Sequence, residues 1–368
     1  MNKESHISIM GLDIGGANTK AALLVYDNGT IIKTSSSIEY FPFWEKTLKD
    51  IPEMLSRIAS VLLNQNNLKL DEVTYFAIAI TCELSDAFQT KKEGINRTID
   101  ALIQIFPPQK LFFMSTDGIY VSEEEARINY LKVAAANWVS TALFLGKINP
   151  NCILIDSGST TIDLIPIKDG NPISNGKTDV ERLKHHELIY TGGLRATIPS
   201  ITHKVPYNDE LIQISFEKFA LVSDVHRILN NITESQYIND TADNRTTSLE
   251  DCYSRLARII CADKDMLTKE ELNKIAEYIY EEQLNLISVE INSFLNELEL
   301  REPALAKKPK FVITGLSADY LIKINLQKLG YNKIFSYENL MQIPDKISSS
   351  AFAVAGALYY QLQDLRIL

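Results

Sequence analysis

The chain of 368 residues is 45% apolar, which is typical of a globular protein with room for two domains. Its formal net charge of -10 repels a phosphate backbone, so the composition argues against a nucleic-acid partner. The cysteines are scattered, without the paired spacing of a zinc site or a disulfide framework: Cys82, Cys152, Cys252 and Cys261.

The first residues lack the apolar core of a signal peptide, and no run approaches the ~18 apolar residues needed to cross a bilayer. We therefore expect a cytoplasmic protein with no membrane partner. The sequence leaves the oligomeric state open, and a homo-oligomer is one of the possible states.

Apolar runs in the first part of the chain predict an α/β unit. Residues 7–15 and 19–40 predict three strands, the last two joined by the turn Asp27-Asn28-Gly29. The next segment, 46–65, predicts a helix with an early Pro52, because its apolar residues recur at steps of three and four: Leu48, Ile51, Leu55, Ile58 and Leu62. Strand, helix, strand and helix are then predicted for 73–81, 97–106, 110–116 and 133–147. This order is typical of a mostly parallel sheet with helices.

The pattern begins again at residue 152. Strand, Asp-x-Gly loop, strand and turn recur, with Asp13 corresponding to Asp156 and Gly15 to Gly158, an offset of 143 residues. Such a repeat indicates a duplication at the scale of a domain. We therefore expect two domains, 1–150 and 151–368.

The second domain is predicted to carry a helical insertion over about 205–308. Thr268 and Glu271 form a capping-box pattern at the start of its long helix. A strand and turn follow in 307–321, and the segment 349–365 predicts a final helix that packs back on the first domain.

The first Asp-x-Gly loop has the composition of a phosphate-binding turn. Gly15 and Gly16 leave the inner wall free of side chains, so that successive N–H groups can face one anion. Asp13 can hold a hydrated magnesium ion, Mg2+. Asn18, Thr19 and Lys20 add an amide, a hydroxyl and a positive charge. Taken alone, the same residues are also typical of a tight hairpin.

The second loop strengthens the prediction. It follows Asp156 with a run of small and hydroxyl-bearing residues: Ser157, Gly158, Ser159, Thr160 and Thr161. Duplicated domains place such loops facing each other across a cleft, where they can clamp a di- or triphosphate with its metal. The alternative is two structural hairpins.

These two loops, with "VITGLSADY" as a third loop containing Gly315, resemble the superfamily of actin, sugar kinases, Hsp70 and hydantoinase-like proteins. The resemblance implies two ribonuclease-H-like domains that face a cleft. Members that use ATP usually have two small residues in the third loop, whereas this chain has Leu316 after Gly315. That departure favours a ligand with phosphates and no nucleoside, although a shift of one residue would admit ATP.

A closer resemblance is to the tetrahydromethanopterin-linked one-carbon-pathway family. It is carried by "GLDIGGANTKAA", "FPFW", "AITCELSDAF", "KKEG", "STDG", "AAANW", "DSGSTTIDLIPI" and "YTGGLRATIPS". The resemblance implies a transferase that joins an aminomethylfuran methyl diphosphate to the phenol of γ-glutamyltyramine. A relative whose acceptor specificity had changed would transfer the furan group to another phenol or to an amine, and would keep the diphosphate site.

The implied chemistry assigns roles to the loops. Asp13 and Asp156 would anchor Mg2+, the loop glycines and hydroxyls would hold the diphosphate, and Lys20 would offset the negative charge of the leaving group. The competing hypotheses are an ATP-dependent small-molecule kinase or hydantoinase-like enzyme, and a non-catalytic nucleotide-binding assembly protein.

The phenol also needs a base, because an unperturbed tyrosine-type hydroxyl is protonated at neutral pH. Asp117 follows one predicted strand, and Glu83 and Asp86 follow its neighbour, where α/β ligands bind. The sugar kinases of the superfamily carry a catalytic aspartate on a similar corner, which favours Asp117. The alternative is that these carboxylates cap the helices that follow. Lys91 and Lys92 either reach the diphosphate or the glutamyl carboxylate of the substrate, or lie on a solvated surface.

Overall fold

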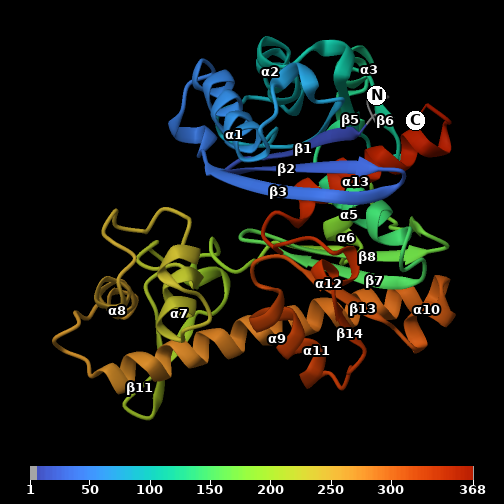
Figure 1. Cartoon of the computed structure of the whole chain (residues 1–368). Helices are drawn as coiled ribbons and strands as arrows, with labels where there is room; N and C mark the ends of the chain where they lie inside the picture. Colours follow the sequence, from blue (N-terminus) through green and yellow to red (C-terminus); the bar gives the residue numbers. More distant parts are fainter. Residues whose placement is uncertain (1–5, 368) are drawn as a thin grey trace. The chain divides into compact units, whose positions relative to one another are not determined.

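The computed structural model of the protein describes residues 6–367 (Figure 1). They form two compact units, which we call unit 1 and unit 2. Unit 1 contains the chain up to Leu154, Ile165–Lys184 and the chain from Phe335 onward. Unit 2 contains Ile155–Leu164 and His185–Ile334. Each unit is therefore assembled from segments that lie far apart in the sequence.

Unit 1 is built on a mixed sheet whose strand order is β3-β2-β1-β4-β5-β6. Its strands are β1 (Ile7–Gly15), β2 (Asn18–Asp27), β3 (Thr30–Tyr40), β4 (Tyr75–Thr81), β5 (Leu111–Met114) and β6 (Tyr120–Val121). β1 is antiparallel to β2 and parallel to β4. The three predicted N-terminal strands, with the turn at Asn28 and Gly29, are confirmed.

The helices of unit 1 are α1 (Asp50–Asn66), α2 (Lys91–Ile105), α3 (Glu123–Ile128), α4 (Tyr130–Val133), α5 (Asn137–Gly146), α6 (Asp179–Lys184), α12 (Tyr337–Met341) and α13 (Ser349–Asp364). In α1 the predicted apolar face is buried, and Pro52 lies in the first turn. Leu48 is the exception, since it precedes the helix and is exposed. The helix starts after Leu48 because the Asp50 carboxylate accepts a hydrogen bond from the N–H of Thr47. This bond holds residues 47–50 in a turn that precedes the helix.

The last helix, α13, packs on β1, β2 and α5 (Figure 1). Gly11 of β1 permits this approach, because a Cβ there would lie 2.8 Å from the backbone nitrogen of Ala355. The rings of Tyr26 and Tyr359 stack with their centroids 3.6 Å apart. Helix and sheet thus share one apolar core although they come from opposite ends of the chain.

The second sheet repeats the arrangement of the first. It contains β7 (Cys152–Ser157), β8 (Ile162–Lys168), β9 (Asn171–Pro172), β10 (Leu188–Ile189), β13 (Phe311–Thr314) and β14 (Ile334–Ser336). Their order is β10-β8-β7-β13-β14, with β9 also pairing with β8. In both sheets the strand before the Asp-x-Gly loop lies between its hairpin partner and the fourth strand, as the duplication predicts.

The segment between β10 and β13 is mainly helical, as predicted, but begins with a hairpin that the sequence pattern does not indicate. The hairpin strands are β11 (Lys204–Tyr207) and β12 (Glu210–Gln213), joined at Asn208 and Asp209, which both adopt positive φ. The helices are α7 (Val222–Ile228), α8 (Leu249–Arg258), α9 (Lys269–Arg301) and α10 (Pro303–Lys307), with α11 (Ile324–Lys328) after β13.

The predicted capping box at the start of α9 is confirmed. The Thr268 hydroxyl accepts from the N–H of Glu271 at 3.2 Å, and the Glu271 carboxylate accepts from the N–H of Thr268 at 2.8 Å. Among residues 6–367, no helix is both long and apolar enough to span a membrane.

Candidate functional site

Asp13 is a buried carboxylate near the end of β1, and hydrogen-bond donors surround it. The hydroxyl of Ser350 donates to Oδ2 at 2.5 Å and the hydroxyl of Thr81 to Oδ1 at 3.3 Å. The amide of Asn137 lies 3.5 Å from Oδ2. Lys20, which pairs with Asp13 across β1 and β2, places Nζ 4.0 Å from Oδ2. The predicted pair of Asp13 and Lys20 is therefore brought together, inside a ring of polar groups.

Sequence reasoning missed three members of this ring: Thr81, Asn137 and Ser350. Thr81 ends β4, and the pairing of β1 with β4 brings it beside the first loop. Asn137 lies in the "AAANW" motif, so the sequence contained a signal for it. Ser350 is in the first turn of α13 and is recognisable only once that helix is seen to cover β1.

The backbone of the first loop, residues 15–18, is oriented by the segment after β3. The N–H of Phe43 donates to the carbonyl of Gly16 at 3.0 Å, and the N–H of Phe41 to the carbonyl of Ala17 at 2.8 Å. A trans peptide holds its N–H opposite its carbonyl, so the N–H groups of Ala17 and Asn18 are directed away from this segment. The "FPFW" motif therefore shapes the loop.

The predicted loop residues differ in exposure. Gly15, Gly16 and Asn18 are half-buried, whereas the side chain of Thr19 is fully buried. The Thr19 hydroxyl lacks a hydrogen-bond partner within the described part of the chain. Its role in diphosphate binding stays a prediction.

The second loop, residues 156–161, is oriented in the same manner by the segment after β10. The N–H of Gly193 donates to the carbonyl of Gly158 at 3.0 Å, and the N–H of Leu194 donates to the carbonyl of Ser159 at 3.0 Å. By the same geometry, the N–H groups of Ser159 and Thr160 are directed away from Gly193 and Leu194. Two successive amides directed to one side form the kind of backbone nest that binds anions.

Gly192 fits against this loop for a steric reason. A Cβ at Gly192 would lie 2.7 Å from both the carbonyl oxygen of Gly158 and the nitrogen of Thr160. Ser157 is fully buried, whereas the side chains of Ser159, Thr160 and Thr161 are half-buried. The hydroxyls of Ser159 and Thr160 lie 3.5 Å apart.

The third loop packs directly on the second. Gly315 has a φ of +93°, and a Cβ there would lie 2.6 Å from Oδ1 of Asp156. The Ser317 hydroxyl donates toward the carbonyls of Ser157 and Gly158, at 3.0 and 3.1 Å. Leu316 is buried, with 5% of its surface exposed. Unit 2 thus brings Asp156, Gly158 and Gly315 to one place.

Glu83, at the corner after β4, is almost completely buried. Its Oε1 contacts Nζ of Lys91 at 3.2 Å, and Lys91 also lies 3.6 Å from Asp179. Its Oε2 is buried without a hydrogen-bond partner among the described residues. Burial raises the pKa of Glu83, and the charge of Lys91 opposes that shift. Gly94 of α2 makes room here, since a Cβ would lie 2.7 Å from the Glu83 carbonyl oxygen.

The other two base candidates have different surroundings. Asp117 lies on an exposed turn after β5, where it forms ion pairs with Lys132, at 2.8 Å, and with Lys177. Hydrogen bonds from Lys132 and Lys177 lower the pKa of Asp117 to about 2. Asp86 is exposed. The sequence placed these three carboxylates at strand ends, but it does not show that burial raises the pKa of Glu83 or that two lysines lower the pKa of Asp117.

Each unit by itself offers one loop carboxylate to a magnesium ion: Asp13 in unit 1 and Asp156 in unit 2. Residues 6–367 contain no group of three His, Cys, Asp or Glu side chains that could hold a metal alone. Hydroxyl and amide donors already occupy the carboxylate oxygens of Asp13. Asp13 would therefore contact a magnesium ion through a bound water molecule. These residues fit Mg2+ carried by a diphosphate, because that ion usually keeps several waters and binds one or two carboxylates plus substrate phosphates.

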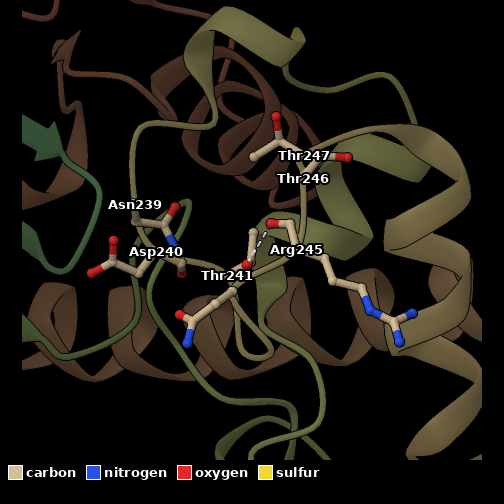
Figure 2. A pocket seen from close by; sticks show the side chains of 7 residues that line it. Asn239, Asp240, Thr241, Arg245, Thr246 and Thr247 are labelled. Atoms are coloured by element: carbon tan, nitrogen blue, oxygen red, sulfur yellow. Dashed lines mark hydrogen bonds between the residues drawn. The ribbon is translucent and has the colours of Figure 1, made fainter.

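An open hollow in unit 2 lies apart from all predicted site residues in the sequence. Figure 2 shows its lining, drawn from 239–241 and 244–247. The Thr241 hydroxyl donates to the carbonyl of Arg245 at 2.8 Å, and the Arg245 side chain points away from Asn239 and Asp240. The lining combines amides and hydroxyls with the charged residues Asp240 and Arg245, and none of the loops described above contributes to it.

Comparisons with known proteins identify a family and several similar proteins. Residues 74–361 match the model of the hydantoinase/oxoprolinase family. A protein of Methanocaldococcus jannaschii named (4-{4-[2-(gamma-L-glutamylamino)ethyl]phenoxymethyl}furan-2-yl)methanamine synthase is 37% identical over 97% of this chain and 99% of its own length. A protein of Methanococcus vannielii with the same name is 35% identical over 59% of this chain and 94% of its own length.

Among solved structures, the nucleotide-free acetone carboxylase from a study of ATP-dependent acetone carboxylation superposes with a TM-score of 0.51. The match has 11% identity and covers 95% of this chain and 70% of that chain. It bears on the fold alone. Both expectations, the α/β fold with its mixed sheets and helices and the closer family resemblance, are confirmed. The chain belongs to the hydantoinase/oxoprolinase family.

Proposed function

We propose that this enzyme forms the aryl alkyl ether of a methanofuran precursor. Its substrates are an aminomethylfuran methyl diphosphate and the phenol of γ-glutamyltyramine. The observation that carries the proposal is the 37% identity over 97% of the chain to a synthase named for that ether product.

The reaction is a substitution at the furan methylene. The phenol oxygen forms a bond to the methylene carbon, and the bond from that carbon to the diphosphate oxygen breaks. The diphosphate leaves with the electron pair, and the phenol proton passes to a base. Bound Mg2+ would supply charge stabilisation to the departing diphosphate.

In this proposal each loop, within its own unit, offers donors to phosphate oxygens of the leaving group. The outward N–H groups of Ser159 and Thr160, and those of Ala17 and Asn18, support contacts to phosphate oxygens. Lys20 would add positive charge beside Asp13. Gly15, Gly16 and Gly315 would keep side chains out of the phosphate path.

Glu83 is the base that the surroundings favour. Its orphan Oε2 is a buried acceptor, and a phenol O–H is a donor that would satisfy it. A raised pKa also makes the carboxylate a better proton acceptor at neutral pH. Asp117 is a weaker base in this structure, because two lysines stabilise its charged form.

The test is a mass-spectrometric assay with Mg2+, the aminomethylfuran diphosphate and γ-glutamyltyramine, with diphosphate release followed in the same tube. We expect ether and diphosphate in equal amounts. Asp13→Asn should lose most turnover, whereas Asp71→Asn, at an exposed carboxylate outside the site, should match the wild type. Absence of ether together with consumption of added ATP would replace the proposal by the kinase hypothesis.

A further inference from the structure

A row of polar side chains, buried except for the half-buried Asn231, runs through unit 2 toward the second loop. The amide of Asn231 lies 3.2 Å from Nδ1 of His226, and Nε2 of His226 lies 3.0 Å from Oε1 of Gln283. Nε2 of Gln283 donates to the Thr191 hydroxyl and to the carbonyl of Gly192, both at 3.0 Å. His226 and Gln283 are at most 1% exposed.

The hydrogen bonds of this row have a defined direction. Gln283 uses its amide nitrogen toward Thr191 and Gly192, so its oxygen must accept from His226. His226 therefore carries its proton on Nε2, and Nδ1 accepts from Asn231. Burial lowers the pKa of His226 to about 3, which keeps the ring neutral and the direction constant. The ring of Tyr320 packs on it, with centroids 4.6 Å apart.

The row ends at the segment that orients the second loop. Gly192 is in close contact with the Gly158 carbonyl, and the next two residues donate to the carbonyls of Gly158 and Ser159. A rotation of the Gly192 peptide would move those donors, and with them the outward N–H groups of Ser159 and Thr160. The α7 and α9 helices thus reach the loop through Gln283.

We infer that Gln283 and His226 are positioning residues that hold the second loop in its diphosphate-binding conformation. The inference rests on the proposed function, because it assigns the diphosphate to this loop. It gives the helical segment a part in substrate affinity: the row extends from α7 through α9 to the Gly192 backbone.

The test compares variants of the full chain by calorimetric titration with magnesium diphosphate. Gln283→Met keeps the side-chain length but removes both donors, and we expect the Kd to rise about tenfold, the effect of one or two hydrogen bonds. His226→Phe leaves Gln283 free to reverse its amide, so we expect a rise of about threefold. This second variant serves if Gln283→Met does not fold.

Ser288→Ala is the matched control, because it removes another polar contact of α9, the 2.6 Å bond from Ser288 to Asn325, which does not involve the loop. We expect it to retain the wild-type Kd. In steady-state assays, Gln283→Met should raise KM for the furan diphosphate and leave KM for γ-glutamyltyramine unchanged.

Two results separate the possible failures. A lower Tm with an unchanged diphosphate Kd in both variants would show that the row only stabilises the fold, and would overturn this inference alone. A wild-type protein that binds no magnesium diphosphate would overturn the leaving-group assignment, and the inference with it.

Discussion

At the scale of single residues, Glu83 and Asp117 show how the same functional group acquires opposite acidities. Glu83 is enclosed by the corner after β4, and loss of solvent raises its pKa despite the nearby charge of Lys91. Asp117 is exposed and held between Lys132 and Lys177, which lower its pKa to about 2. A proton acceptor for a phenol is therefore better provided by Glu83.

Glu83→Gln should reduce kcat for ether formation at least about 100-fold, the usual contribution of a general base. In the wild type, kcat should rise with pH through the raised pKa of Glu83, because only the ionised carboxylate accepts a proton. The variant should lose that dependence. The measurement is kcat against pH across the acidic and neutral range.

Asp117→Asn is the control for this experiment, and it should keep the pH profile of the wild type. If Asp117→Asn instead abolished turnover while Glu83→Gln stayed active, Asp117 would be the base.

The same pKa shift has a consequence for stability. Because the folded-state pKa of Glu83 lies above its unfolded value, folding favours the protonated form. The free energy of unfolding therefore falls as pH rises from the ordinary carboxyl range through the folded-state pKa. Glu83→Gln removes this loss, so the variant should be more stable than the wild type at neutral pH. Urea unfolding at neutral and acidic pH measures the difference, and a less stable variant would contradict the assignment.

At the scale of elements, close contacts between loops require glycine where neighbouring atoms already fill the position of a Cβ. Gly315 and Gly330 both have positive φ, at +93° and +86°. A Cβ at Gly315 would lie 2.6 Å from the Asp156 carboxylate, whereas a Cβ at Gly330 would meet nothing within 4 Å. Alanine at Gly330 would add backbone strain alone, whereas alanine at Gly315 would add backbone strain and also displace the second loop.

Gly315→Ala should weaken the binding of magnesium diphosphate as well as stability, because the new methyl group displaces Asp156. Gly330→Ala should cost only about 1 kcal/mol of unfolding free energy, from its backbone conformation, and should bind as the wild type does. Titration calorimetry and denaturant unfolding of both variants give the comparison. Equal diphosphate binding by the two variants would exclude a role for the third loop at the site.

A buried ion pair joins α7 to α8. Nε of Arg255 donates to Oδ1 of Asp224 at 2.8 Å, and the Tyr237 hydroxyl donates to the same oxygen at 2.8 Å. Both members of the pair are fully buried. Removing one partner leaves a charge without its counter-ion, which is worse than removing both.

Arg255→Met should therefore lower the free energy of unfolding by about 3–5 kcal/mol. The double variant Arg255→Met, Asp224→Asn should recover part of that loss, since it no longer leaves a buried carboxylate unpaired. Equilibrium unfolding in urea measures both. A double variant no more stable than the single one would show that Asp224 is not left as an uncompensated buried charge.

At the scale of the whole molecule, unit 1 is completed by the last helix of the chain. Helix α13 supplies Ser350 to Asp13, packs Ala355 against Gly11 of β1 and stacks Tyr359 on Tyr26 of β2. The first sheet cannot bury that face with its own N-terminal residues. The candidate site in unit 1 therefore depends on both ends of the sequence.

Deletion of residues 349–368 should abolish cooperative unfolding of unit 1, because it exposes an apolar sheet face and removes a hydrogen bond to Asp13. Truncation after Asp364 should leave the thermal unfolding curve close to that of the wild type. Circular dichroism and the yield of soluble protein distinguish the two. Cooperative unfolding of the longer deletion would show that β1 and β2 are stabilised without α13.

The features that the sequence predicted correctly are local ones. The Asn28-Gly29 turn, the capping box of Thr268 and the repeated Asp-x-Gly loops each depend on a few neighbouring residues. The ring around Asp13 could not be assembled in this way, since Ser350 lies 337 positions away. The β11–β12 hairpin was missed because its short strands contain a single buried residue, Val205, and so show no alternation of buried and exposed positions. Burial, which separates Glu83 from Asp117, is a property of the folded chain.

The closure of unit 1 by α13 also sets the order of events on the ribosome. Gly11 emerges 344 residues before Ala355, the residue that packs on it. At about 5–20 residues per second, the apolar face of β1 waits roughly 17–70 s for its covering helix. The nascent chain therefore exposes an aggregation-prone apolar sheet face during nearly all of translation. A chaperone that binds this face during synthesis should raise the yield of active enzyme more than a chaperone that acts after release.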